Sequence, residues 1–254
     1  MQYFYVIAVF MLFFVGISLD AFQQNSAHGQ SNELVFSITD NPYNNTFTYW
    51  VDKWFDWFLS LPNVEGNEML MHPRDNYSPE KCSWNQDDSS PVWMLPDGRD
   101  SNDLTEVEMR ECSVPSGKAL LVQIVGSNCS EEEGLKNDKD IMECATWVLP
   151  QAQFSATVDG KEVMNTITDP SHRDKFYVKP FFANITYAKS NYYGASEGTY
   201  RGAEAGIFLF VKPLPIGNHT IQFQESVINT LDSTGNDKRI SNVQYNMVIE
   251  NSTK

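Results

Sequence analysis

The motif with the most direct catalytic meaning is Gly194-Ala195-Ser196-Glu197-Gly198, which matches the Gly-x-Ser-x-Gly pattern of the nucleophile elbow in α/β-hydrolases. In that elbow a helix follows the serine, and the hydroxyl stands on a strained turn beside an oxyanion hole. Here the next residues are Thr199-Tyr200-Arg201-Gly202, a segment that does not favour a helix, and the only downstream histidine is His219. We therefore interpret the motif as a glycine-rich loop without a nucleophile.

Histidine is scarce in the chain, with one residue in a polar N-terminal segment and three further on, at His72, His172 and His219. No two of them are four residues apart, so the helical zinc motif of metalloproteases is absent from the sequence. A single histidine is more often a surface or core group than a ligand. A metal site assembled from these residues only in the folded protein stays an alternative, and its metal is unknown.

Oxygen-bearing side chains gather in two segments, and such side chains are the ligands that Ca²⁺ prefers. The first contains Asp97, Asp100, Asn102 and Asp103, and the second contains Asp232, Asn236 and Asp237. Neither has the ligand spacing of an EF-hand, and clusters of this kind usually favour turns and water. Calcium remains a hypothesis, and no other cofactor is predicted.

Aromatic residues form the most unusual pattern. Trp50, Trp54, Trp57, Phe58 and Leu61 recur at helical spacing and Pro62 ends the run, which predicts a helix with one apolar face. Those rings could stack on sugars, but one-sided periodicity favours packing of the helix onto a sheet. A second set lies on predicted loops and strand ends and is the candidate binding patch: Trp84, Trp93, Tyr192 and Tyr193.

The N-terminus predicts export. Residues 1–19 are almost entirely apolar and a polar stretch follows, so residues 1–22 are interpreted as a signal peptide or an uncleaved anchor and residues 23–33 as a linker. The four cysteines all lie in the remaining residues 34–254. An even number of cysteines in an exported chain predicts two disulfides. We prefer Cys82–Cys112 and Cys129–Cys144, because each of these pairs encloses one local segment of the chain.

Surface chemistry points to the same compartment. Asn-x-Ser/Thr sequons, the acceptors of N-glycosylation, begin at Asn44, Asn128, Asn184, Asn218 and Asn251. The 18 basic and 33 acidic residues give a net charge of -15, which repels nucleic acids and anionic lipid headgroups. We therefore expect an extracellular or cell-envelope glycoprotein that meets the membrane only through residues 1–19, if these are retained.

Alternating apolar and polar residues predict a mostly β fold. Residues 153–163 read as a hairpin with Asp159-Gly160 at its turn, and residues 243–249 alternate in the last strand. Residues 119–125 and 206–211 are apolar on both faces, as in central strands that are covered on each side. Shorter predicted strands cover residues 34–39, 92–95, 107–112, 176–182 and 185–189.

Two short peripheral helices interrupt the strands, the aromatic one described above and a second at residues 137–148. The segment 169–174 is interpreted as a solvated turn because it contains Pro170 and mixed charges. Residues 34–254 are thus predicted to form a single β-sandwich, Ig-like or jelly-roll-like.

Several segments together resemble a group of uncharacterised secreted bacterial and archaeal proteins. They are the aromatic helix 49–57, Pro91-Val92-Trp93-Met94-Leu95, the segments 110–120 and 156–160, and residues 213–221. The similarity spans most of residues 47–249 and consists of turn and core signatures. It implies export, paired cysteines and one β-rich domain, and it carries over no catalytic residues.

The leading hypothesis is a secreted or envelope-associated, non-catalytic binding module whose ligand is an extracellular protein or a glycan. One alternative is a secreted hydrolase whose acid or metal site is assembled only on folding. Another is a structural component of a glycosylated cell surface.

Overall fold

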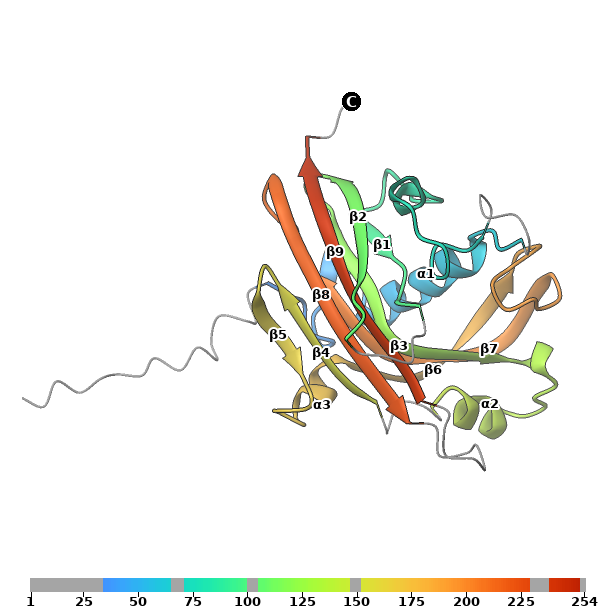
Figure 1. Ribbon diagram of the computed structural model, residues 1–254. Coiled ribbons are helices and arrows are strands. Elements are labelled where there is room, and N and C mark those ends of the chain that lie inside the picture. The colour runs from blue at the N-terminus through green and yellow to red at the C-terminus, as the bar shows by residue number, and fades with distance from the viewer. Residues whose placement is uncertain (1–33, 65–70, 100–104, 147–151, 229–237, 252–254) are drawn as a thin grey trace, which may run out of the picture.

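Two β-sheets stacked face to face make up most of the molecule (Figure 1). The computed structural model describes residues 34–64, 71–99, 105–146, 152–228 and 238–251. Within them nine strands form a four-stranded and a five-stranded sheet, so the predicted mostly β sandwich is confirmed. The predicted signal peptide or anchor and the linker that follows it, residues 1–33, lie outside the described residues.

The four-stranded sheet has the order β1-β3-β7-β6. Its strands are β1 (Val92–Leu95), β3 (Ala119–Ser130), β6 (Tyr177–Tyr187) and β7 (Gly198–Val211). β3 and β7 are antiparallel and central, as their apolar sequences predicted, whereas β1 pairs with β3 in parallel.

The five-stranded sheet has the order β2-β9-β8-β4-β5. It contains β2 (Glu108–Pro115), β4 (Gln153–Val158), β5 (Lys161–Asn165), β8 (Gly217–Ile228) and β9 (Lys238–Glu250). β4 and β5 form the predicted hairpin, and Asp159 and Gly160 have the positive φ values that its two-residue turn requires. β2 and β9 pair in parallel, and neither this pair nor β1–β3 was predicted.

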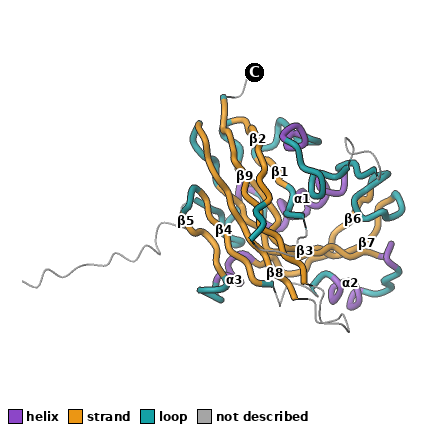
Figure 2. Tube along the Cα trace, in the orientation of Figure 1, coloured by secondary structure: helices purple, strands orange, loops and turns teal. Residues whose placement is uncertain are grey.

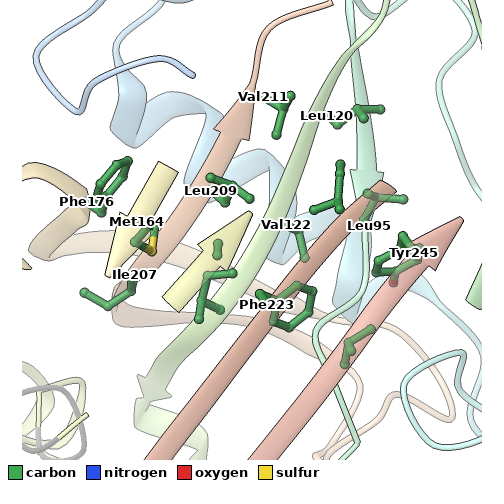
Figure 3. Packing of buried hydrophobic residues seen from close by; sticks show 14 of the residues in the cluster. Leu95, Leu120, Val122, Met164, Phe176, Ile207, Leu209, Val211, Phe223 and Tyr245 are labelled. Atoms are coloured by element: carbon green, nitrogen blue, oxygen red, sulfur yellow. The ribbon is translucent and has the colours of Figure 1, made fainter. Parts of the chain in front are cut away.

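The main core lies between the sheets (Figure 3). Leu120, Val122, Ile207, Leu209 and Val211 of the four-stranded sheet meet Met164, Phe223 and Tyr245 of the five-stranded one. Because strand side chains alternate between faces, the intervening residues of β3 and β7 point away from this core. They form a second core with the helix on the opposite side of the sheet.

That helix is α1 (Phe47–Ser60), which lies on the outer face of the four-stranded sheet (Figure 2). The side chain of Thr46 caps its N-terminus by accepting a hydrogen bond from the backbone amide of Tyr49 at 3.2 Å. The indole groups of Trp50, Trp54 and Trp57 are buried and donate to backbone carbonyls. The predicted packing role of the aromatic stripe is therefore confirmed.

The remaining helices are short: α2 (Asp138–Cys144), α3 (His172–Phe176) and the 3-10 turns η3 (Pro42–Asn44), η4 (Pro79–Ser83) and η5 (Glu131–Glu133). α2 confirms the second predicted helix, whose last two predicted residues lie outside the described part. α3 replaces the turn expected near Pro170, because a helix of five residues is too short to show a periodicity. In the described chain, no helix has the length and apolarity needed to cross a bilayer.

Three predicted strands differ from the structure. Residues 34–39 form only an isolated bridge, in which Val35 pairs with Val211 at the end of β7. Residues 176–182 and 185–189 were predicted as two strands but belong largely to the single strand β6, which has a register shift between Val178 and Phe181. A bulge of this kind breaks the alternation that the prediction relied on.

Both preferred disulfides are present. Cys82 of η4 bonds to Cys112 of β2, with the Cα atoms 5.6 Å apart, and Cys129 of β3 bonds to Cys144 of α2, with the Cα atoms 6.0 Å apart. Each bond fastens a short helical segment to a strand. The segments around η4 and α2, which carry few apolar residues, are thereby held against the sandwich.

Candidate functional site

The structure does not assemble the predicted aromatic patch. Trp93 is only 4% exposed and belongs to the core between the sheets. Trp84 packs beside α1, under the ammonium group of Lys81. Tyr192 and Tyr193 do lie together, with ring centroids 5.2 Å apart, but among the described residues no ring contact joins them to Trp84.

The three histidines in the described part have structural partners. His72 is buried, and burial lowers its pKa to about 4; its Nε2 donates to the carbonyl of Phe58, and its Nδ1 accepts from the amide of Arg74. His172 Nδ1 accepts from the amide of Asn165 at 2.9 Å. The sequence could not reveal these partners, because they come from other loops and strands.

His219 and Asp159 come closest to a catalytic pair, with Nδ1 and Oδ2 2.7 Å apart. The other ring nitrogen, Nε2, lies 2.9 Å from the carbonyl oxygen of Pro215. The Asp159 carboxylate and the Pro215 carbonyl are both acceptors, so each ring nitrogen of His219 is engaged by a group of the protein itself. Ser196, the rejected nucleophile, is exposed, and β7 rather than a helix follows it.

Metal-ligand geometry occurs once in the described residues, at Cys129, Glu133 and Cys144. The two cysteines form a disulfide, so they offer no thiolate to a metal. Of the oxygen-rich segments, Asp97 is buried and bonds to Arg74 at 3.0 Å. Asp100, Asn102, Asp103, Asp232, Asn236 and Asp237 lie outside the described residues, so the calcium hypothesis stays a prediction.

A cleft beside α1 is the strongest candidate for a binding site. It has a volume of about 350 Å³, within the usual range for small-ligand sites. Its aromatic walls are Tyr43, Tyr49, Trp50 and Trp57, and its polar rim includes Asn45, Lys53, Asn85, Asp87 and Ser90. Tyr43 and Tyr49 are 37% and 41% exposed, so their rings are open to a ligand.

Local interactions hold the walls of the cleft. Asn85 Nδ2 donates to the backbone oxygen of Ser60 at 3.1 Å and thereby fastens the loop after η4 to the end of α1. Gln86 bonds through its amide group to both the N–H and the C=O of Met94, and so covers the free edge of β1. Lys118 reaches from the β2–β3 turn to the carbonyl of Asp88 at 2.6 Å. The loop that forms one wall is therefore fixed at three points.

Two residues that line this cleft have unusual backbone angles. Tyr43 has φ 56° and Asn85 has φ 50°, both in the left-handed region. Asparagine tolerates that region, whereas a tyrosine there costs about 1–3 kcal/mol and persists only when its surroundings hold it. The Tyr43 ring packs edge-on against Trp50 at 6.0 Å, and Trp50 Nε1 donates to the carbonyl of Pro42. These contacts present the Tyr43 ring at the mouth of the cleft.

The lining of the cleft combines aromatic rings with charged and amide groups. Lys53 is paired with Asp56, which lies 2.6 Å away and raises the pKa of the ammonium group. The hydroxyl and amide of Ser89 lower the pKa of Asp87, so that carboxylate stays ionised at neutral pH. The lining contains no histidine or cysteine. Two exposed rings with amide and carboxylate groups around them match a ligand that has an apolar ring face and a polar edge.

No family model matches the chain, and no curated protein sequence matches it. The resemblance to secreted bacterial and archaeal proteins therefore stays a prediction. Sequence reasoning found Trp50 and Trp57 but missed Tyr43, Tyr49 and Asn85. The Asn-rich segment 41–45 was a usable signal, because runs of asparagine favour positive φ and tight turns.

Proposed function

We propose that this protein is an exported, non-catalytic binding module that holds a sugar ring in the cleft beside α1. The observation that carries the proposal is the pair of exposed rings, Tyr43 and Tyr49, set over a cleft rimmed by Asn45, Asn85 and Asp87. The carbon face of a pyranose can stack on tyrosine, while its hydroxyls bond to amides and carboxylates.

Compartment and stability support an extracellular role. The two disulfides would persist in an oxidising environment, and the apolar N-terminal segment is typical of exported chains. The cleft also offers rigid walls, since its loop is fastened to α1, β1 and the β2–β3 turn. A rigid site loses little conformational entropy when it binds.

Tryptophan fluorescence tests the proposal directly, because Trp50 and Trp57 line the cleft. Titration with methyl glycosides of glucose, galactose and mannose and with N-acetylglucosamine should give a saturable change with at least one of them. Tyr49→Ala should weaken that binding at least tenfold. Tyr193→Ala, which removes a 51% exposed ring outside the cleft, is the matched control and should bind normally. Equal loss in both variants, or none in either, would contradict the assignment.

A further inference from the structure

The outer face of the five-stranded sheet has an unusual composition for so acidic a chain. β9 presents Gln244 and Asn246 at partly exposed positions, because Tyr245 and Met247 beside them point into the core, whereas Asn242 on the same face is only 4% exposed. By the same alternation β8 presents Thr220, Gln222 and Gln224, and β4 presents Ser155 and Thr157. Amides and hydroxyls thus replace the charged residues that usually cover a solvent-facing sheet.

The strand register aligns these groups into rows that cross the sheet. Gln244 of β9 pairs with Gln222 of β8, which pairs with Thr157 of β4. The next row joins the partly exposed Gln224 and Ser155 to Asn242, which is buried. Neighbouring strands are about 4.8 Å apart, so each row offers a regular series of hydrogen-bonding groups.

Hydrogen bonds between the amides hold this surface in place. Gln222 Nε2 donates to Asn242 Oδ1 at 3.3 Å across the two strands, and Gln244 Nε2 donates to Asn246 Oδ1 at 2.9 Å along β9. A side-chain amide has two N–H donors and an acceptor oxygen, so the partly exposed amides of Gln222, Gln244 and Asn246 can bond to a neighbour and to a ligand as well. The face is therefore ordered before any ligand arrives.

At one end the face is hollowed into a groove of about 540 Å³. Ser113 and Glu111 of β2, Asn246 and Val248 of β9, and Asn218 and Thr220 of β8 line it. The turn residue Asp159, paired with His219, closes one side. In the views of Figures 1 and 2, α1 and α2 lie with the four-stranded sheet, where they contact β3, β6 and β7.

The composition of this face selects among ligands. Among the outward side chains that the structure describes on β2, β9, β8 and β4 there is no Lys or Arg, and the exposed Lys161 of β5 lies near Asp159 at the side of the groove. The net charge of -15 repels phosphate, sulfate and acidic sugars. Protein partners favour surfaces with aromatic anchors, and these strands present no aromatic ring outward. The hydroxyls of a neutral polysaccharide can donate hydrogen bonds to amide oxygens and accept them from amide N–H groups.

We propose that this amide face and its groove are a second binding surface, which takes an extended strand of a neutral polysaccharide. The surface lies on the sheet opposite to the cleft beside α1 and uses none of its residues. The inference stands even if the cleft takes a different ligand. If both sites bind glycans, one molecule can engage two strands, and linkage would raise its apparent affinity for a polymer.

Affinity electrophoresis tests the surface with defined probes. The chain is produced in a host that attaches no N-glycans and is run in gels containing dextran, mixed-linkage β-glucan, galactomannan or polygalacturonate. We expect at least one neutral polymer to retard it and polygalacturonate not to. The double substitution Gln222→Glu and Gln244→Glu keeps the shapes but adds two charges, and should weaken retardation at least tenfold.

Two controls separate this proposal from the other site and from charge effects. Asn184→Asp with Thr186→Glu adds the same charge on the exposed side of β6 and should leave retardation unchanged. Tyr49→Ala should weaken the binding of small sugars measured by fluorescence at least tenfold but keep the retardation. No retardation by any neutral polymer, retardation by polygalacturonate alone, or equal loss in the β6 control would each overturn the proposal.

Discussion

The guanidinium of Arg110 donates a hydrogen bond from Nη1 to the hydroxyl of Tyr245 at 2.7 Å. The Tyr245 hydroxyl in turn donates to the carbonyl of Pro96 at 2.8 Å. Arg110 lies on β2 and Tyr245 on β9, whereas Pro96 directly follows β1 of the other sheet. Arg110 also binds the carbonyl of Asp97 at 2.9 Å and the carboxylate of Glu108 at 2.8 Å. This buried arginine thus ties the two sheets together.

Removal of Arg110 should therefore be costly. Arg110→Met leaves buried carbonyls and the Tyr245 hydroxyl without their donor, and we expect a loss of about 3 kcal/mol in the free energy of unfolding. Tyr245→Phe keeps the ring and should lose about 1–2 kcal/mol. Urea unfolding measures both. Tyr49→Phe, which removes an exposed hydroxyl, is the control. Full additivity in the double variant would show that the two residues do not act together.

The pH dependence of stability should report the burial of His72. Its folded-state pKa is about 4, against about 6.5 for an unfolded histidine. Between pH 6.5 and pH 4, His72 is protonated in the unfolded chain but stays neutral in the folded protein. The contribution of neutral His72 to the free energy of unfolding is therefore complete above pH 6.5 and is lost as the pH falls towards 4. The loss should be roughly 3 kcal/mol. His72→Asn, which can accept and donate in similar directions, should flatten this part of the curve. An unchanged slope would contradict the assignment.

Glu204 should make the folded protein less stable as the pH rises, the opposite of the effect of His72. It is buried on β7 beneath α1; burial, together with Asp52 and Asp56, raises its pKa well above the usual value, and Lys53 opposes this only in part. The folded protein keeps the proton while the unfolded chain loses it, so stability falls as the pH rises from 4.5 towards the raised pKa. Glu204→Gln should raise the urea midpoint at pH 8 and leave it nearly unchanged at pH 4. Equal effects at both values would refute the mechanism.

Glycan occupancy should follow side-chain exposure. Asn44, Asn184, Asn218 and Asn251 are exposed, whereas Nδ2 of Asn128 is buried on β3. A glycan on Asn128 could not be accommodated in the folded sheet. Expression in a glycosylating host, followed by peptide mass spectrometry of the secreted fraction, should find glycans at some of the exposed positions and none at Asn128. A folded product modified at Asn128 would contradict this placement.

The sequence predicted the elements whose pattern is local. The apolar runs of β3 and β7 indicated central strands because each strand is covered on both faces, and the Asp159-Gly160 turn identified its hairpin. The parallel pairing of β2 with β9 could not be predicted from a local sequence pattern, since over a hundred residues separate the two strands. The cleft was missed for the same reason. Tyr43, Tyr49 and Asn85 come from separate segments, and two of them depend on backbone angles that no periodicity reveals.

The position of β9 constrains how the chain can be made. β9 lies between β2 and β8, so the strand that completes the middle of the five-stranded sheet ends at residue 250. During synthesis or translocation, residues 108–115 must wait for β9 with no strand paired to either edge, because β9 is the partner of β2 in the sheet. Such long-range closure is slow, and the exposed edge is open to other chains in the interval. A factor that shields nascent β2 until β9 emerges would therefore raise the yield of folded protein.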